Sequence, residues 1–220
     1  DYAPLCENAV LTLSGTIGGA ASTASWTSSG GGTFSDSSAL NSTFTPPANF
    51  VGTITLTLTT DDPTGPCLAA VDTVIITVLP TPIIDSISNL EVCNNDEVGP
   101  IVFTGTDTTA YAWVNSNPAI GLAAAGSGAI SFTAINLGTS PITATITVTP
   151  INSSLGANCS GISKSFTILV NPSAKVNPIS DLFLCDGEVA PVITFSTTNT
   201  VGTTTYSWTN SNNTIGFGDS

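Results

Sequence analysis

The sequence predicts an all-β protein in which antiparallel β-sandwich modules follow one another along the chain. One observation is a repeat: the segments that begin at Tyr111 and Tyr206 share the pattern Tyr-x-Trp-x-Asn-Ser-Asn-x-x-Ile-Gly. Another is an alternation of apolar residues with threonine, as in residues 53–60. A period of two is typical of strands that bury one face and expose the other. No comparable helical pattern indicates a second fold class.

Cysteine and tryptophan residues recur at one interval along the chain. Cys6 and Cys93 are 93 − 6 = 87 residues apart, as are Trp26 and Trp113, and Cys185 follows Cys93 at 185 − 93 = 92 residues. A repeat of this length suits one small β-sandwich. The interval predicts the following domains: residues 1–80, residues 81–172, and residues 173–220 as the N-terminal half of a third module.

The alternating runs also place the individual strands. Turn-forming residues join two of these runs, residues 53–60 and 72–78, into a hairpin. Proline-rich junctions at residues 79–83 and 171–178 predict a semi-rigid string of modules, because proline favours extended backbone. The other expected strands are residues 10–14, 24–28, 42–45, 101–106, 110–115, 129–134, 142–150 and 164–170.

The charge inventory excludes several function classes. The chain has 15 acidic residues, two basic residues, no histidine and a formal net charge of −13. Nucleic acid is therefore not an expected partner, because phosphate binding needs a basic surface. The absence of a long apolar run excludes direct membrane insertion. Without histidine, the usual Ser-His-Asp and Cys-His catalytic arrangements cannot form, and we expect no enzyme activity and no catalytic residue.

The five cysteines sort by module and predict disulfides. Cys6 and Cys67 fall in the first module, and Cys93 and Cys159 fall in the second. We expect each pair to fasten the first strand of its module to the last hairpin loop, at one end of the sandwich. Cys185 begins the third module, so its partner is expected beyond residue 220. Paired cysteines indicate an oxidising, extracellular setting.

Acidic residues near the first cysteines are the candidate metal ligands. If Cys6 and Cys67 pair, Glu7 comes near Asp61 and Asp62, while Asp96 and Glu97 follow Cys93 in the same way. Hard oxygen ligands at a module end suit Ca²⁺, which would stiffen a junction. The alternative is that these carboxylates only solvate turns. No other cofactor is expected.

Further motifs carry a family resemblance. The repeated Tyr-x-Trp pattern is followed by Thr149-Pro150, Cys159-Ser160-Gly161 and a strand that ends in Val170-Asn171-Pro172. These features resemble the PKD-like repeats, with an Ig-like fold, of very large cell-surface adhesins from Bacteroidota. The resemblance covers essentially the whole chain, although the Trp-Asp-Phe-Gly core of eukaryotic PKD domains is missing. It implies gliding-motility adhesins and related surface proteins exported by type IX secretion.

The resemblance also implies sites of O-glycosylation. Bacteroidota attach O-glycans at Asp-Ser/Thr-x, and this pattern places candidate sites at Thr73, Ser86 and Thr108. The alternative is a chance match, because a three-residue pattern arises easily in a threonine-rich chain.

These observations predict a structural stalk segment of a large secreted bacterial cell-surface adhesin, which projects a distal adhesive or sorting domain. Its expected partners are further repeats of the same polypeptide, with surface polysaccharide or outer-membrane motility and secretion machinery as external candidates. Two alternatives stay open. One is a glycan-binding surface module, which a groove of exposed aromatic side chains would indicate. The other is a subunit of an extracellular fibre, in which a neighbouring chain completes the third module.

Overall fold

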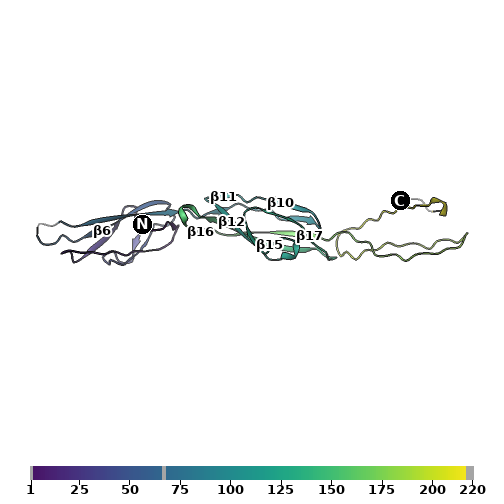
Figure 1. Cartoon of the computed structure of the whole chain (residues 1–220), viewed down its shortest axis with the longest axis horizontal. Coiled ribbons are helices and arrows are strands. Elements are labelled where there is room, and N and C mark those ends of the chain that lie inside the picture. Colours follow the sequence, from purple (N-terminus) through teal and green to yellow (C-terminus); the bar gives the residue numbers. More distant parts are fainter. Residues whose placement is uncertain (1, 66–67, 217–220) are drawn as a thin grey trace.

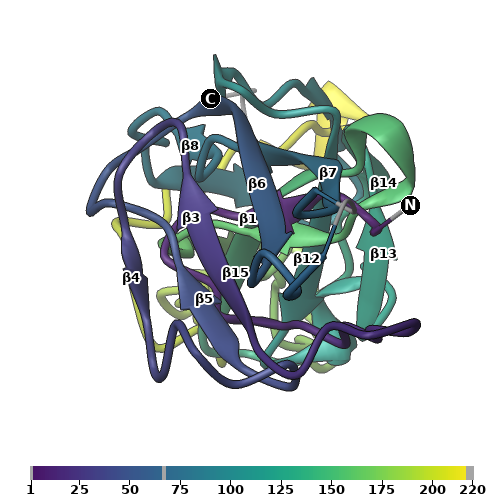
Figure 2. The ribbon, with the colours of Figure 1, turned by 90° about the vertical axis from the view of Figure 1, so that its left-hand side faces the viewer.

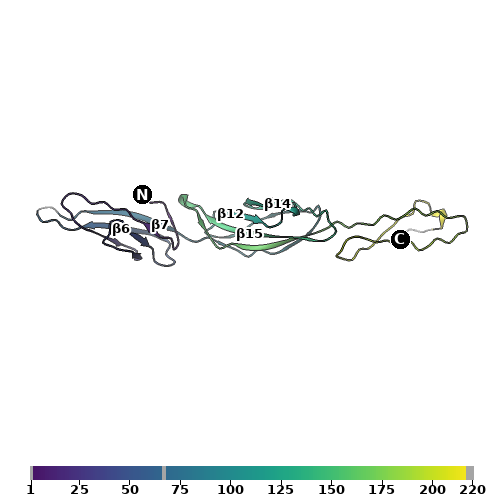
Figure 3. The same cartoon turned by 90° about the horizontal axis from the view of Figure 1, so that it is seen from below.

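The computed structural model describes residues 2–65 and 68–216. This part of the chain is nearly all β, which confirms the predicted fold class, and its helices are single 3-10 turns. Figures 1 and 3 show an elongated molecule in which a first sandwich, a second sandwich and a C-terminal segment follow one another. The 3-10 turns are η1 (Pro118–Ile120), η2 (Ser154–Gly156) and η3 (Asn213–Ile215).

The first sandwich comprises strands β1 to β7 and packs two sheets against each other. One sheet has the strand order β1-β7-β6-β3 and the other has the order β2-β5-β4. Figure 2 views these strands along the long axis of the molecule. Their bounds are β1 (Leu5–Cys6), β2 (Leu11–Thr12), β3 (Ala24–Ser28), β4 (Thr33–Phe34), β5 (Thr43–Thr45), β6 (Gly52–Thr60) and β7 (Val71–Leu79).

The second sandwich comprises strands β8 to β17. Its large sheet has the order β13-β12-β15-β17-β9, with β16 paired to β15, and two small sheets are formed by β10-β14 and β11-β8. The bounds are β8 (Ile83–Ile84), β9 (Leu90–Cys93), β10 (Glu97–Ile101), β11 (Gly105–Thr106), β12 (Ala110–Asn115), β13 (Ala125–Ser127), β14 (Ile130–Thr133), β15 (Ile142–Asn152), β16 (Cys159–Ser160) and β17 (Lys164–Asn171).

Each sandwich has its own apolar core, and a tryptophan lies in each. Ile54 and Leu56 on β6 are fully buried, whereas the threonines between and beside them are partly or fully exposed. Trp26 belongs to this core, and Trp113 belongs to the core of the second sandwich. Both were expected from the sequence to fill cores, and their burial confirms the expectation.

Most long strands lie where the alternation predicts them. Residues 53–60, 110–115 and 164–170 match β6, β12 and β17 within one residue at each end. The strand expected at residues 101–106 is wrong: β10 ends at Ile101, and β11 begins only at Gly105. β10 and β11 belong to different small sheets, so the chain leaves one sheet and joins another inside this run.

Parallel edge strands decide which residues lie at each end of a sandwich. β1 runs parallel to β7 with Cys6 beside Leu79, and β9 runs parallel to β17 with Cys93 beside Asn171. We call the end at which the last strand leaves the sandwich its exit pole. The opposite end, which carries the hairpin loop between the last two long strands, is the loop pole. Cys6 and Cys93 therefore lie at the exit poles.

The C-terminal segment, residues 173–216, follows the second sandwich with extended backbone but no assigned strand in the part that the structure describes. Phe195 stacks on Tyr206 with ring centroids 5.7 Å apart. Most of its large aliphatic residues stay exposed. Val98 in the motif Glu-Val-Gly-Pro of the second sandwich is 5% exposed, whereas Val189 in the matching Glu-Val-Ala-Pro is 92% exposed. The difference arises because Val98 lies on β10, which pairs with β14 and packs into the core of the second sandwich, whereas Val189 lies on no assigned strand of the described segment.

Candidate functional site

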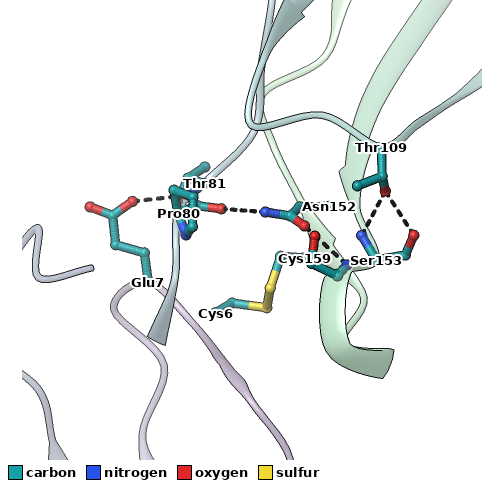
Figure 4. The surroundings of a disulfide bond; sticks show 9 residues. Cys6, Glu7, Pro80, Thr81, Thr109, Asn152, Ser153 and Cys159 are labelled. Atoms are coloured by element: carbon teal, nitrogen blue, oxygen red, sulfur yellow. Dashed lines mark hydrogen bonds between the residues drawn. A yellow bond between two sulfur atoms is a disulfide. The ribbon is translucent and has the colours of Figure 1, made fainter. Parts of the chain in front are cut away.

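The junction between the two sandwiches is held by a disulfide bond. Cys6 on β1, at the exit pole of the first sandwich, bonds to Cys159 on β16, at the loop pole of the second (Figure 4). The two Cα atoms are 5.4 Å apart, within the range that a disulfide spans without backbone movement. Cys159 is buried and Cys6 is half-buried, so the bond is partly shielded from solvent by the junction.

This pairing corrects the one expected from the sequence. Cys93, expected to bond Cys159, is a free, exposed cysteine, and so is Cys185. Cys67 lies outside the described residues, but its expected partner Cys6 bonds elsewhere. The physical reason is the direction of the edge strands. At about 3.3 Å per strand residue, poles at opposite ends of a nine- to eleven-residue strand lie about 30 Å apart, far beyond the reach of a disulfide.

Hydrogen bonds close the same junction around the disulfide. The carboxylate of Glu7 accepts the backbone N–H of Thr81 at 3.1 Å, and the side-chain amide of Asn152 donates to the carbonyl of Pro80 at 3.4 Å (Figure 4). Asn152 is one of the few buried polar side chains of the described chain. Both contacts hold residues 80–81, which link the sandwiches, so the linker is fixed from both sides.

A glycine of the second sandwich packs against this linker. A Cβ atom placed on Gly161 would lie 1.8 Å from the carbonyl oxygen of Pro82. We expect Gly161→Ala to destabilise the protein by about 1–3 kcal/mol, because two backbones would have to separate. Gly18→Ala is the matched control, since nothing lies within 4 Å of a Cβ at Gly18, and its effect should stay within about 0.5 kcal/mol. Urea unfolding measures both, and equal effects would contradict the close packing.

The exit pole of the second sandwich contacts the C-terminal segment by hydrogen bonds. The side-chain amide of Asn94, the residue after Cys93, donates to the hydroxyl of Ser173 at 2.9 Å. Farther along, the backbone N–H of Thr200 donates to the carbonyl of Thr139 at 2.9 Å. Asn94 therefore reaches the residue two positions beyond the last strand, as Glu7 does at the first junction. The two junctions share this construction.

The structure separates the candidate calcium ligands of the first sandwich. Glu7 lies at the exit pole, whereas Asp61 and Asp62 follow β6 at the loop pole. The expectation that a Cys6–Cys67 bond would bring them together is therefore wrong. In the second sandwich, Asp96 and Glu97 are occupied by protein donors, the backbone N–H of Cys93 at 2.7 Å and the hydroxyl of Thr133 at 2.8 Å. Within the described residues, no group of three or more acidic or cysteine side chains could hold a metal ion.

Asp61 serves instead as a hydrogen-bond acceptor that holds residues 22–23 to β6. Its carboxylate accepts the N–H of Thr23 at 3.0 Å and both the N–H and the hydroxyl of Ser22, at 2.9 and 2.8 Å. The Thr23 N–H, followed by the Ser22 groups, lowers the pKa of Asp61 below its usual range. These donors favour the charged carboxylate.

The lowered pKa predicts a stability effect in acid. A carboxyl group with a lower pKa in the folded state stabilises the fold above its unfolded pKa, about 3.9, and this contribution is lost as the pH falls through the folded pKa. We expect Asp61→Asn to flatten the loss of stability between neutral pH and about pH 3, and Ser22→Ala to flatten it partly. Thermal unfolding across this range tests the prediction. Superimposable pH profiles for Asp61→Asn and the unmodified chain would contradict it.

The candidate glycosylation sites differ in access. Thr73 and Ser86 are exposed, whereas Thr108 is half-buried and its hydroxyl donates to the carbonyls of Ile83 and Thr106 at 3.2 and 3.0 Å. Glycosylation stays a prediction for all three, and Thr73 and Ser86 are the accessible positions. The intact mass of the secreted protein checks it.

The three tyrosines of the chain, whose rings could stack on a sugar in a glycan-binding module, pack against other aromatic rings or the core. Tyr111 lies 5.6 Å from Phe103, Tyr206 stacks on Phe195, and Tyr2 packs against the core of the first sandwich. All three are half-buried. They do not form a shared platform, because each belongs to a different part of the molecule.

The sequence did not reveal the bond between sandwiches. Each complete repeat has one cysteine near its start and one in its last hairpin loop. This pattern is the same whether the bonds form within modules or between neighbouring modules. The missing information was the parallel pairing of the two-residue strand β1 with β7, which carries no periodic signal. With that pairing, the disulfide and the hydrogen bonds of the junction can restrict the angle between the two sandwiches. In the part of the chain that the structure describes, none of the helices could span a lipid bilayer.

Comparisons with known proteins find similarity only among solved structures. No protein-family model matches the chain, and no curated protein matches it. The insect immune protein hemolin is 13% identical over 78% of this chain and 46% of that chain, with a TM-score of 0.35. The human desmocollin-1 ectodomain is 16% identical over 79% and 38%, with a TM-score of 0.32. Surface layer protein SbsC, domains 1–6, is 12% identical over 70% and 21%, with a TM-score of 0.26. The chain spans less than half the length of each of these structures.

Proposed function

We propose that this chain is a stalk segment of a large secreted adhesin on a bacterial cell surface, in which stapled β-sandwich modules hold a distal adhesive or sorting domain away from the cell. The observation that carries the proposal is the Cys6–Cys159 bond, which joins the exit pole of one sandwich to the loop pole of the next. A bond in this place adds nothing to a binding surface. It restricts bending between neighbouring modules, which a spacer requires.

Other features support the same role. The molecule is elongated, and residues 80–82 are held by Glu7, Asn152 and Gly161. A net charge of −13 keeps such a segment soluble and repels anionic surfaces. Disulfide formation suits the oxidising environment outside the cell. The proposal gives the chain a spacer role and no catalytic one, with further modules of its own polypeptide as direct neighbours.

The finer proposal is an adhesin of the Bacteroidota gliding type, exported by type IX secretion. It rests on the Tyr-x-Trp repeat and the Cys159-Ser160-Gly161 and Val170-Asn171-Pro172 motifs. Surface polysaccharide and outer-membrane motility or secretion machinery are then external partners of the whole adhesin. Calcium stays a proposal for the whole adhesin without an assigned ligand set, because no group of three candidate ligands gathers in the described residues. Calorimetry with and without a chelator tests it, and an unchanged melting profile would contradict it.

Small-angle X-ray scattering of the oxidised chain tests the stalk role. We expect the pair-distance distribution of a rod, with one short cross-section and a long tail. Reduction of the disulfide should broaden the distribution, because the junction gains freedom to bend. A compact, near-spherical profile for the oxidised chain would overturn the proposed function.

A fibre subunit is a second candidate, favoured by the exposed apolar residues of the C-terminal segment. Phe183, Val189 and Val192 are each about nine-tenths exposed in the described structure. Another chain could cover them by strand addition. Light scattering after size-exclusion chromatography distinguishes the two functions: a stalk segment keeps a constant monomer mass across concentrations, whereas a fibre subunit grows in mass with concentration.

A further inference from the structure

Cys93 occupies the same structural position in the second sandwich as Cys6 in the first. Each is the last residue of a short strand that runs parallel to the final strand, beside Leu79 in one sandwich and Asn171 in the other. In each, the next backbone N–H donates to the carbonyl of that strand-end residue, at 3.0 Å in the first sandwich and 2.8 Å in the second. The two cysteines are therefore presented at equivalent exit poles.

The turn that follows these cysteines is also repeated, and a third copy follows Cys185. The residue two positions beyond the cysteine has a left-handed backbone each time, with φ of 64° at Asn8, 71° at Asn95 and 83° at Gly187. The residue three positions beyond donates its N–H to the cysteine carbonyl at 3.0, 3.1 and 3.1 Å respectively. Positive φ is uncommon outside glycine, and two of the three residues are asparagines, so the same backbone at one offset indicates a turn that recurs with each cysteine.

No partner for Cys93 is available inside its own sandwich. Cys159 lies at the opposite pole. There its backbone pairs with that of Asn152 between strands β16 and β15, and its sulfur is bonded to Cys6. Cys93 itself is exposed and free. A bond to Cys93 would therefore need a cysteine from outside the second sandwich, as the bond to Cys6 needs one from outside the first.

The pole that carries Cys93 already receives the next part of the chain. Asn94 contacts Ser173 at 2.9 Å, and the hydroxyls of Ser140 and Thr200 lie 2.8 Å apart. The C-terminal segment repeats the sequence of the second sandwich from its cysteine turn to the Tyr-x-Trp motif. A complete module in this place would present its own loop pole, and the position equivalent to Cys159, toward Cys93.

We propose that Cys93 forms a disulfide with the cysteine that the following module carries at the position of Cys159, so that each junction in the series has the staple seen at the first. This inference rests on the proposed stalk function, because it requires modules in series. Cys185 has the same role one module farther on. The recurring bond links the exit pole of each module to the loop pole of the next.

Formation of this bond needs a disulfide donor, such as a thiol–disulfide oxidoreductase of the export compartment. The thiolate of one cysteine attacks the donor disulfide and forms a mixed disulfide, releasing one donor thiolate. The thiolate of the second cysteine then attacks the protein sulfur of that mixed disulfide and releases the other donor thiolate. The two cysteines lose two protons and two electrons, and the donor is reduced to a dithiol.

Disulfide mapping of the secreted full-length protein tests the inference. Free thiols are alkylated without reduction, the protein is digested, and linked peptides are identified by mass spectrometry. We expect one linked pair to contain Cys6 and Cys159, and another to contain Cys93 and a cysteine C-terminal to Cys185. Alkylated Cys93, or Cys93 linked to Cys159, would overturn the inference.

The Cys93→Ser variant gives a second readout from the same protein. We expect it to add one alkylated thiol, located in the following module. If Cys93 is free, the variant instead loses one alkylated site, and if Cys93 bonds Cys159, the new thiol is Cys159; either result overturns the inference. Scattering of the same sample keeps the two proposals apart: a rod-shaped profile with the Cys6–Cys159 bond intact and Cys93 alkylated would overturn the inference and leave the stalk function standing.

Discussion

Replacing Cys159 with serine is expected to lower the stability of both sandwiches. The Cys6–Cys159 bond spans 153 residues, and with either sandwich unfolded it still closes that sandwich's chain into a loop anchored on the folded neighbour. The chain-entropy model gives about 4–5 kcal/mol for loops of this size, as an upper figure. Chemical unfolding of the oxidised protein measures the change, which should appear in the transitions of both sandwiches.

Two further variants identify the pairing. Cys6→Ser should reproduce the loss caused by Cys159→Ser, and the double variant should lose no more than either single variant, because all three remove one bond. Cys93→Ser in the chain of residues 1–220 is the matched control, and its exposed thiol should change stability by about 0.5 kcal/mol or less. A loss with Cys93→Ser equal to that of Cys159→Ser would contradict the bond between sandwiches.

Trp113→Ala is expected to destabilise the second sandwich by about 3–5 kcal/mol, the usual result of emptying a large buried aromatic site. Trp113 is 7% exposed and lies in the core with Phe103 and Phe166. It packs over Gly126, its partner on β13, where an added Cβ would lie 2.3 Å from the indole ring. Gly126 therefore leaves the space that the indole ring fills, and we expect removal of the ring to leave a cavity. Urea unfolding followed by circular dichroism measures the loss.

Trp208→Ala is the matched control, because Trp208 occupies the same place in the Tyr-x-Trp motif. It is half-buried and lines an open apolar hollow with Ala190, Val192 and Phe195. We expect its removal to cost about 1 kcal/mol or less. Equal losses for the two tryptophans would show that the motif alone, rather than the strands packed around Trp113, determines how much free energy of unfolding is lost.

The alternation of apolar residues with threonine was sufficient to predict the long strands and the cores. Ile146 and Val148 are fully buried on β15, whereas Thr145 is exposed and Thr147 is half-buried. Such a run has one arrangement that buries its apolar face. Two-residue strands such as β1 and β16 contain no period, so their partners and directions could not be predicted from the sequence.

This gap explains why the site was predicted only in part. Cys6, Cys93, Cys159 and Glu7 were correctly placed at module ends, since turn residues surround them. The choice of end was wrong, because the hairpin loop and the first strand were assumed to share a pole. Parallel pairing of β1 with β7 moves Cys6 and Glu7 to the exit pole, and with them the predicted disulfide and the predicted metal ligands.

The Cys6–Cys159 bond also decides how the molecule responds to tension. A pull between the N-terminus and Pro172 passes from Cys6 directly to Cys159 and then along β17. The intervening chain bears no load, and at about 3.5 Å per extended residue roughly 500 Å of contour length is withheld. The first sandwich is shielded even if its core is weak. The extensibility of the bridged pair is therefore limited by one covalent bond and by the pairing of β17 with β9 and β15, rather than by the stability of either core.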